Sequence, residues 1–564
     1  MKPGAIVVLG AGPTGLSAAL TLGAEATLVE REERVGGCCR SIVAGGFTFD
    51  HAGHIMFSND PYVHDLYRML LGDNVHWQER EAWIYSKGVH TRYPFQGALY
   101  GLPPQVIQEC LIGAIEARFG PLRPPSPESL RPLDADAEPR GTNGNGHAAS
   151  NGHANGNGHA NGNGHANGNG HANGNGHVGV KGNGDGFANG NGHAFDSCDA
   201  SGDVKDCCAD GILEAEAPLG IPEPGRTPWT EPKNFEEFIH RVWGAGIARH
   251  FAIPYNRKLW KVPLDEMETS WLGGRVPLPD LGEMIEGALS PVPKPMGPNA
   301  RFGYPLRGGF QALMDGFLPH LRADLRLGVE AVRLVPSKNT VVLSDGSTLP
   351  YESVISTIPL PRLVRLMGAE APSAVRDAAA GLRHLSVRCV NLGVGRPGLT
   401  EKHWIYYPEN TVFHRIFVQG NASPHCNPPG GFGLTCEITY SKDHPLPSDG
   451  DELIERCIED CRRVGLVGEE DPIWTACQVD LPYAYVIYDH ERKERVDHIR
   501  AWLLERDVVL AGRFSEWEYY NSDHAFVAGR DAAVKARQRC QERRAAALRP
   551  GRITARSERT SMSL

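Results

Sequence analysis

The sequence predicts an α/β protein. A doubly wound domain with a parallel sheet is assembled from separated segments, and a helical domain and an antiparallel β-sheet domain are inserted into it. Three observations predict this arrangement. A glycine-rich turn follows a short apolar run near the N-terminus, a helical segment is interrupted by a low-complexity stretch, and β-rich runs fill much of the second half. The 564 residues are enough for several domains.

The first element is the turn Gly10-Ala11-Gly12-Pro13-Thr14-Gly15, which lies between the apolar run Ala5–Leu9 and the segment Leu16–Leu20. This order predicts a strand, a tight turn and a helix. Glycines let the backbone approach a pyrophosphate, which binds where the N–H groups of the helix N-terminus point outward. A second strand, Ala26–Val29, ends at Glu30, whose carboxylate can bind a ribose hydroxyl. The unit is therefore predicted to be a Rossmann-like dinucleotide-binding unit; the alternative is a glycine-rich turn in an ordinary α/β unit.

Composition narrows the classes of partner. The net charge of −10, from 57 basic and 67 acidic residues, argues against nucleic acid or an anionic membrane as the main partner. The 13 cysteines are odd in number and form no disulfide framework, which favours the reducing cytoplasm. No apolar run reaches about 18 residues, so no membrane insertion is expected. The sequence makes no prediction of oligomeric state.

Residues 121–230 differ from the rest of the chain. They carry tandem Asn-Gly-Asn-Gly-His-Ala units with a histidine every six residues from His147 to His177. Because Asn, Gly and Ala bury too little apolar surface to offset the entropy of ordering, this composition predicts a disordered insertion. The alternative is a histidine-rich metal tract, helped by Cys198, Cys207 and Cys208. No metal site is predicted, because this spacing in a flexible chain gives no fixed ligand geometry.

The remaining elements follow from periodicity. Helices are predicted at Gln105–Phe119 and Asn234–Phe251, so the insertion lies in a loop between two helices. The segment Val329–Pro350 alternates like a strand pair. Further strands are predicted at Val354–Thr357, Val387–Val394, His403–Tyr407, Val412–Val418, Gly433–Thr439, Trp474–Val479 and Val508–Leu510, followed by a closing helix at Gly529–Glu542.

These elements predict the domain boundaries. The dinucleotide-binding domain comprises residues 1–72, 291–382 and 501–545, and the sheet domain comprises 73–96 and 383–500. The helical domain spans 97–290, including the insertion, and 546–564 form a disordered tail. A ligand is expected in the cleft where the three domains meet.

A second glycine motif follows Glu30. The run Arg34-Val35-Gly36-Gly37-Cys38-Cys39-Arg40-Ser41 resembles the second glycine motif of the flavin amine-oxidase-like superfamily, and Gly512-Arg513 resembles its third cofactor segment, near the flavin ribityl chain. The resemblance implies FAD rather than NAD, with the cation of Arg34 near a phosphate. The implied cofactor-binding residues are Gly10, Gly12, Pro13, Thr14, Gly15, Glu30, Arg34, Gly36, Gly37, Gly512 and Arg513.

More specific stretches narrow the family, and they resemble the UDP-galactopyranose mutases, particularly the eukaryotic-type branch. They run in order along nearly the whole globular chain: Ala52–Ser58, Tyr93-Pro94-Phe95-Gln96, Pro254–Pro263, Gly274-Arg275-Val276-Pro277, Gly297-Pro298-Asn299 and Gly512-Arg513-Phe514-x-x-Trp517-x-Tyr519. In this family FAD is active when reduced, and its N5 attacks the anomeric carbon of a UDP-sugar and expels UDP. The sugar ring opens, recloses in the other ring size, and UDP adds again.

The resemblance implies roles for particular residues. A departing diphosphate needs fixed cations, which Arg275 and Arg415 match. His54 is expected beside the flavin ring and is counted with the two arginines as a catalytic candidate. The expected substrate-binding residues are Phe95 and Gln96 for the uridine, Asn299, and the diphosphate-binding tyrosines Tyr406, Tyr485 and Tyr519. The alternatives are structural ion pairs for the arginines, and ordinary packing for His54 and the tyrosines. Tyr483 and Tyr488 are the alternatives to Tyr485 for its role.

The chain departs from the family pattern at two places. Residue 238 is Phe where the eukaryotic-type helix has Trp, and the segment Glu518–His524 is shorter than its counterpart. These differences do not change the predicted reaction class. They allow the sugar of the substrate to be another NDP-hexose or a deoxysugar in place of galactose. The expected partner is a nucleotide sugar, with NAD(P)H as a candidate reductant. The alternative functions are an FAD-dependent oxidoreductase of the amine-oxidase or protoporphyrinogen-oxidase type and a flavin-binding protein without turnover.

Overall fold

A computed structural model describes residues 4–122, 231–273, 280–291 and 300–548. The low-complexity stretch, Arg275, Asn299 and most of the C-terminal tail lie outside these residues, so the predictions made for them stay predictions. Within the described part of the chain, no helix combines the length and apolar character needed to cross a bilayer. The same residues contain no group of three or more His, Cys, Asp or Glu side chains placed to hold a metal ion.

A five-stranded parallel sheet carries the glycine-rich turn. Its strand order is β19-β13-β1-β2-β9, with the strands at Val508–Leu510, Ser353–Ser356, Ile6–Leu9, Ala26–Val29 and Asp324–Arg326. The chain moves to one side of β1 with β2 and β9, and to the other side with β13 and β19. In such sheets the crevice outside the carboxyl ends of the strands, at this change of direction, binds ligands. Gly10 lies at that point, directly after β1.

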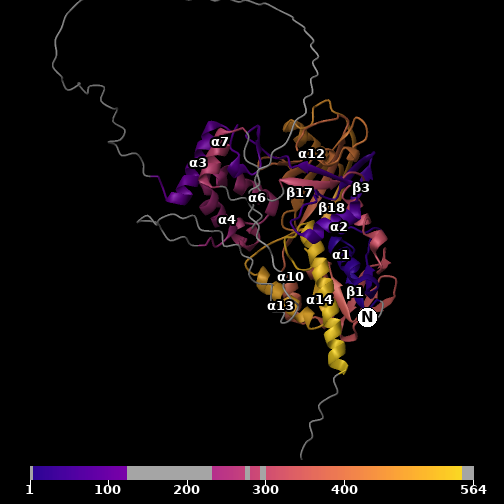
Figure 1. Ribbon diagram of the computed structural model, residues 1–564. Coiled ribbons are helices and arrows are strands. Elements are labelled where there is room, and N and C mark those ends of the chain that lie inside the picture. The colour runs from indigo at the N-terminus through magenta and orange to yellow at the C-terminus, as the bar shows by residue number, and fades with distance from the viewer. Residues whose placement is uncertain (1–3, 123–230, 274–279, 292–299, 549–564) are drawn as a thin grey trace, which may run out of the picture. The chain divides into compact units, whose positions relative to one another are not determined.

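The two ends of the described chain pack against each other beside this sheet. Helix α1 (Pro13–Leu22) begins at the glycine turn, and α14 (Ser522–Leu548) lies along it, as the indigo and yellow ribbons of Figure 1 show. The Ser17 hydroxyl donates a hydrogen bond to the Phe526 carbonyl at 2.6 Å. A Cβ at Gly529 would lie 2.2 Å from the Thr14 carbonyl oxygen, so only glycine permits this approach. Helix α14 begins earlier and ends later than the predicted helix Gly529–Glu542.

The helical region is built around a close glycine contact. Helix α3 (Pro104–Phe119) agrees with its prediction to one residue, and the segment predicted at Asn234–Phe251 is helical from Phe235 onward but is not one continuous helix. Gly244 has φ +84°, and a Cβ there would lie 2.1 Å from the Gly113 carbonyl oxygen of α3. The segment is instead divided into α4 (Phe235–Phe238), the π-helical turn η4 (Ile239–Trp243), α5 (Gly244–Ile247) and the π-helical turn η5 (Ala248–Ala252), after which come α6 (Ile253–Trp260) and α7 (Leu281–Leu289).

A seven-stranded sheet forms the other main layer. Its order is β18-β14-β17-β16-β15-β6-β7, and every neighbouring pair is antiparallel except β15 and β6, which are parallel. One face is covered by α12 (Gly450–Arg463), whose buried side chains meet Cys436 and its neighbours in a separate apolar core. The strands are Ile473–Val486, His384–Val394, Phe432–Tyr440, Arg415–Phe417, Trp404–Tyr406, Ala82–Ser86 and Val89–Arg92.

Three smaller sheets complete the β structure. Strands β10, β11 and β12 (Ala331–Val335, Thr340–Leu343 and Thr348–Pro350) form an antiparallel sheet where the strand pair was predicted. The hairpin of β3 and β4 and the pair β5 and β8 connect the glycine motifs to the seven-stranded sheet (Ser41–Ala44, Phe47–Asp50, Val75–Glu79 and Arg301–Pro305). The α/β fold class with parallel and antiparallel sheets is as the sequence predicts.

Candidate functional site

Two cavities meet in the described residues. The glycine cavity, of about 460 Å³, is lined by the turn after β1 and by the second glycine motif. The tyrosine cavity, of about 1020 Å³, is lined by aromatic side chains of the helical region and the seven-stranded sheet, and by polar and aliphatic residues between 516 and 535. Arg415, Tyr485 and Tyr519 line both cavities and so mark the junction.

The glycine cavity has the features of a dinucleotide site. Helix α1 begins at Gly12 with no side-chain cap, and Gly10, Gly12, Pro13 and Thr14 line the cavity, so its N-terminal turn is open to an anion. Gly15 does not line it, because it packs against the Gly10 carbonyl. The Glu30 carboxylate also lines the cavity while accepting hydrogen bonds from the backbone N–H groups of Ala11 at 2.7 Å and Glu32 at 3.0 Å. These bonds hold the carboxylate where a ribose hydroxyl can reach it.

The second glycine motif meets the first one through backbone. The Gly36 N–H donates to the Ala11 carbonyl at 2.8 Å, and a Cβ at Gly37 would lie 3.1 Å from the Gly12 Cα. Gly37 lines the cavity. Gly36, with φ +120°, does not line it and contacts the first turn through its N–H. The expectation that Arg34 lies near a phosphate is not met. Its half-exposed guanidinium does not line the cavity and lies 3.6 Å from the Asp315 carboxylate.

Arg513 shows the clearest fit to a cofactor. Its guanidinium donates to the carbonyls of Tyr520 at 3.0 Å and Ala484 at 2.8 Å, and its Nε is buried without a partner. Since an unpaired buried donor is costly, an acceptor group in the cavity that Arg513 lines would satisfy it. Gly512 does not line the cavity, and its N–H donates to the Glu516 carboxylate at 2.8 Å.

His54 lines the glycine cavity close to the junction. Its Nδ1 lies 2.9 Å from the Ala52 carbonyl oxygen, and its ring stacks on Phe310 with centroids 5.2 Å apart. Burial is the main reason that the pKa of His54 falls to about 4, with a smaller contribution from the positive charge of Arg513. The imidazole is therefore neutral at physiological pH, and it offers a hydrogen bond rather than a charge.

Arg415 on β16 is held by Glu437 on β17. The two residues face each other directly across the strands, and the guanidinium donates to the Glu437 carboxylate from Nε at 3.1 Å and Nη2 at 2.5 Å. Burial lowers the pKa of Arg415, but the negative charge of Glu437, together with Tyr485, Tyr406 and Tyr255, outweighs it and leaves that pKa well above its usual value. The other Glu437 oxygen accepts from the Gly53 N–H at 3.3 Å, which connects Arg415 to the segment that carries His54.

Three tyrosines surround this guanidinium. Tyr406 is the direct cross-strand neighbour of Arg415 on β15, and Tyr485 accepts a hydrogen bond from Arg415 at 3.4 Å. Tyr519 stacks on Tyr485 with centroids 6.1 Å apart and the ring planes at 16°. Burial raises the pKa of Tyr485 far above physiological pH, so its hydroxyl stays protonated. The structure thus brings together all three tyrosines that the resemblance implied.

Of the two residues predicted to bind the uridine, only one lies at a cavity. Gln96 lines the tyrosine cavity, but Phe95 does not. Phe95 is fully buried and stacks on Phe251, with ring centroids 4.9 Å apart, because the turn Phe95–Gly97 directs it into the helical core. Phe251 takes the place on the cavity wall that was expected for Phe95.

The structure also adds cavity residues that the prediction omitted. Arg80 donates to the Tyr406 hydroxyl at 3.1 Å, and Tyr93 stacks on Tyr406 with centroids 5.1 Å apart. Both line the tyrosine cavity, as does Tyr255 of α6. Glu437 carried a readable signal, since it is a lone carboxylate in the otherwise apolar strand segment around it. No local pattern distinguishes Arg80 from a surface residue.

Comparison with protein families agrees with this site. Residues 8–70 match the NAD(P)-binding Rossmann-like domain, and residues 264–536 match the flavin containing amine oxidoreductase family. The first match covers the turn at the glycine cavity, and the second covers strands β14 to β18 of the seven-stranded sheet and the Gly512-Arg513 segment.

Comparison with solved structures points in the same direction. The chain is similar to a crystal structure of reduced UDP-galactopyranose mutase, with a TM-score of 0.73 and 25% identity, over 95% of this chain and 94% of that one. A putative protoporphyrinogen oxidase from Exiguobacterium sp. gives a TM-score of 0.57 at 14% identity, over 95% and 98% of the two chains. Putrescine oxidase bound to putrescine gives 0.52 at 14% identity, over 94% and 98%. These last two likenesses show the fold alone.

Proposed function

Because the chain is an FAD-binding enzyme of the flavin amine-oxidase-like superfamily, we propose that it is an NDP-sugar pyranose–furanose mutase, with UDP-galactose as its default substrate. The observation that supports this most is the position of Arg415, at the junction of the two cavities. A guanidinium suits phosphate oxygens, which accept two parallel hydrogen bonds from it. From this position Arg415 can bind the diphosphate of a nucleotide sugar while the sugar faces the cofactor.

The charge of the junction favours an anionic substrate over an amine. Arg415 and Arg513 both line the glycine cavity. Of the carboxylates there, Glu437 is fully buried and engaged by Arg415, and Asp523, which lines both cavities, lies 2.9 Å from the Nδ1 of His524. An ammonium group would meet like charges there, and like charges in a partly buried site repel strongly. A diphosphate would meet cations and the protonated hydroxyl of Tyr485. The net charge of the whole chain, −10, does not predict this local field.

The residues of the chain have distinct parts in the proposed reaction. Reduced FAD, when bound, supplies the nucleophile for the anomeric carbon. Arg415 binds the diphosphate and stabilises the charge that develops on it as it leaves, aided by the hydroxyls of Tyr406 and Tyr485. His54 stays neutral, so it contributes no second positive charge beside the flavin ring. Gln96 is placed to bind the uracil base, and NAD(P)H is the proposed reductant.

The second candidate function is an FAD-dependent oxidoreductase of the amine-oxidase or protoporphyrinogen-oxidase type. The match of residues 264–536 to the flavin containing amine oxidoreductase family favours it. The aromatic lining of the tyrosine cavity would also accept an apolar substrate. The cation cluster at the junction has no evident use in this alternative.

One assay, run with the reduced and with the oxidised holoenzyme, distinguishes the two functions. The dithionite-reduced holoenzyme is incubated with UDP-galactofuranose and with a panel of other NDP-sugars, and the sugar nucleotides are resolved. The proposed function predicts UDP-galactopyranose from the reduced enzyme and no conversion by the oxidised enzyme. Oxygen consumption with an amine or a porphyrinogen, without any sugar isomer, would establish the alternative.

A further inference from the structure

A buried polar cluster lies behind the cavity junction. We define the Tyr488 cluster as Tyr488, Arg492 and Glu518. Arg492, the first residue of α13 (Arg492–Leu504), is 6% exposed, and its guanidinium carbon lies 4.0 Å from the centroid of the Tyr488 ring. It also forms an ion pair with Glu518. None of the three side chains lines either cavity, so the cluster can affect a ligand only through other residues.

The cluster fixes an unusual backbone conformation. Trp517 has φ +61°, which costs a non-glycine residue roughly 1 kcal/mol or more. Arg492 donates from Nε at 2.9 Å and from Nη2 at 2.5 Å to the Trp517 carbonyl. The Arg492 guanidinium therefore holds the chain where it turns, two residues before Tyr519. The Trp517 side chain is fully buried, which keeps the turn in place from the other side.

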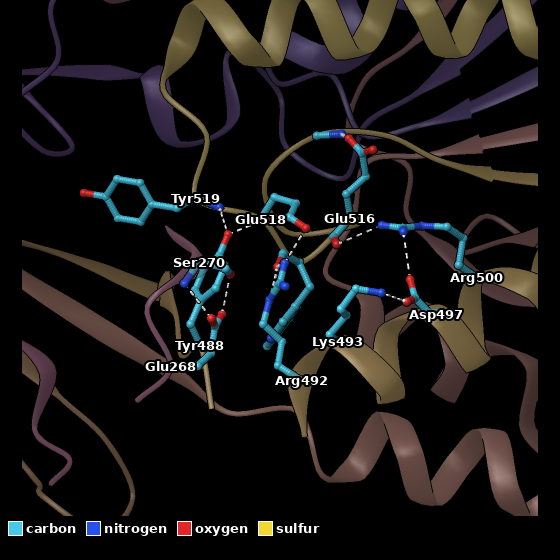
Figure 2. A network of polar contacts seen from close by, with 12 residues as sticks. Glu268, Ser270, Tyr488, Arg492, Lys493, Asp497, Arg500, Glu516, Glu518 and Tyr519 are labelled. Carbon is cyan, nitrogen blue, oxygen red and sulfur yellow. Dashed lines mark hydrogen bonds and ion pairs between the residues drawn. The ribbon is translucent and has the colours of Figure 1, made fainter. Parts of the chain in front are cut away.

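The Tyr488 hydroxyl continues this connection to Tyr519. It donates to the Glu518 carboxylate at 2.5 Å and accepts from the Tyr519 backbone N–H at 2.7 Å. Burial is the main cause that raises the pKa of Tyr488 far above physiological pH, so this donor is retained. Figure 2 shows the result: the backbone of Tyr519 is bound to the cluster, while its ring points away from it.

The ring of Tyr519 in turn belongs to the junction. It stacks on Tyr485, and the Arg513 guanidinium carbon lies 4.6 Å from its centroid. Tyr485 accepts a hydrogen bond from Arg415. A shift of Tyr519 would therefore change its contacts with Arg513, on the cofactor side of the site, and with Tyr485, on the diphosphate side.

We propose that Tyr488, Arg492 and Glu518 are positioning residues that set the affinity for the nucleotide diphosphate by fixing Tyr519 against Tyr485. This inference rests on the proposed function, because it takes a nucleotide diphosphate as the ligand of the junction. It predicts that a substitution outside the cavities weakens ligand binding without loss of FAD.

The test is a titration of the oxidised holoenzyme with UDP, followed by the flavin absorbance and by calorimetry. We expect Tyr488→Phe, which leaves the Tyr519 N–H and the Glu518 carboxylate short of a partner, to weaken UDP binding about 10-fold with unchanged FAD content. Glu518→Gln keeps the side-chain shape and carries the same expectation if Tyr488→Phe folds poorly. The control is Lys493→Ala, which removes only an exposed ion pair with Asp497 (Figure 2) and should leave UDP affinity unchanged.

A double-mutant cycle separates positioning from general stability. If Tyr488 acts through the Tyr519 ring, Tyr488→Phe should weaken UDP binding less than about 2-fold in a Tyr519→Ala background, where no ring is left to position. Equal effects in both backgrounds, or unchanged affinity in Tyr488→Phe and Glu518→Gln, would overturn the inference while leaving the proposed function intact. If the unsubstituted holoenzyme does not bind UDP, the proposed function fails and the inference fails with it.

Discussion

Arg415 and Glu437 are direct cross-strand partners on β16 and β17, and their side chains form a two-bond pair at the meeting point of two cavities. The carboxylate is fully buried, whereas the guanidinium keeps one side toward the cavities. Glu437 also lines the glycine cavity, but its charge is engaged by Arg415. It holds the cation in one orientation and, through the Gly53 N–H, connects it to the His54 segment.

We expect Glu437→Gln to retain FAD but to lose ligand affinity. The amide keeps the size of the side chain and removes the charge that orients Arg415. Breaking a buried pair in this way destabilises a protein by about 3 kcal/mol, so the melting temperature should fall as well. UDP affinity, FAD content and melting temperature should be measured on the same preparations. Unchanged UDP affinity would contradict the orienting role.

Gly15→Ala should yield protein depleted of FAD. The new Cβ would lie 1.8 Å from the Gly10 carbonyl oxygen, so the turn between β1 and α1 must move, at a cost of about 1–3 kcal/mol. The matched control is Gly23→Ala at the other end of α1, where φ is +60° and nothing lies within 4 Å of the added Cβ. That variant should lose about 1 kcal/mol of stability and keep its flavin. Equal flavin content in the two variants would argue against the turn as the pyrophosphate site.

Buried histidines predict a loss of stability in mild acid. Burial lowers the pKa to about 4 in His51, His54 and His403, from the usual 6.5. Between these values the unfolded chain binds protons that the folded chain does not, so the free energy of unfolding falls as pH falls from 6.5 to 4. Melting temperatures measured at pH 7, 6 and 5 should therefore decline in that order. A flat or rising series would contradict the neutral, buried assignment.

Lys258→Met should loosen the loop between β15 and β16, the two strands that carry Tyr406 and Arg415. The Lys258 amine donates to the carbonyls of Tyr407 at 3.0 Å and Glu409 at 2.8 Å, and to the Thr411 hydroxyl at 2.6 Å. Loss of these bonds should cost about 2–3 kcal/mol, measured by denaturant unfolding.

The neighbouring substitution Arg257→Ala is the control for Lys258→Met. It removes an exposed contact with Glu236 and should cost less than about 0.5 kcal/mol. Similar losses in both variants would show that Lys258 has no special part in holding this connection.

Local signals in the sequence were sufficient for four strands of the parallel sheet, but β9 (Asp324–Arg326) was not predicted. The strand at Ala26–Val29 and the strand at Val508–Leu510 have the bounds that were predicted, because each is a short apolar run ended by a turn or a polar residue. Strand β18 was predicted to be much shorter, at Trp474–Val479. Strand β18 continues through Pro482 because it is at the edge of its sheet, where a residue without an N–H is tolerated.

Distant contacts set the limit of what could be predicted. Phe95 is turned away from the cavity by Phe251, and Arg34 pairs with Asp315, and neither partner is near in sequence. The division of the helix at Gly244 depends on Gly113, across the low-complexity stretch. Glu437 was not predicted either, because only the register of β16 and β17 identifies Arg415 as its partner.

The central claim is that Arg415 binds the diphosphate of a nucleotide sugar, and the affinity of Arg415→Ala for UDP tests it most directly. The control is Arg388→Ala, which removes another partly buried arginine of the same sheet, paired with Asp449 and Asp480 outside both cavities. We predict that Arg415→Ala binds UDP about 10- to 100-fold more weakly than the unsubstituted holoenzyme, with full FAD content, whereas Arg388→Ala binds it normally. Equal UDP affinity in all three proteins would contradict the account.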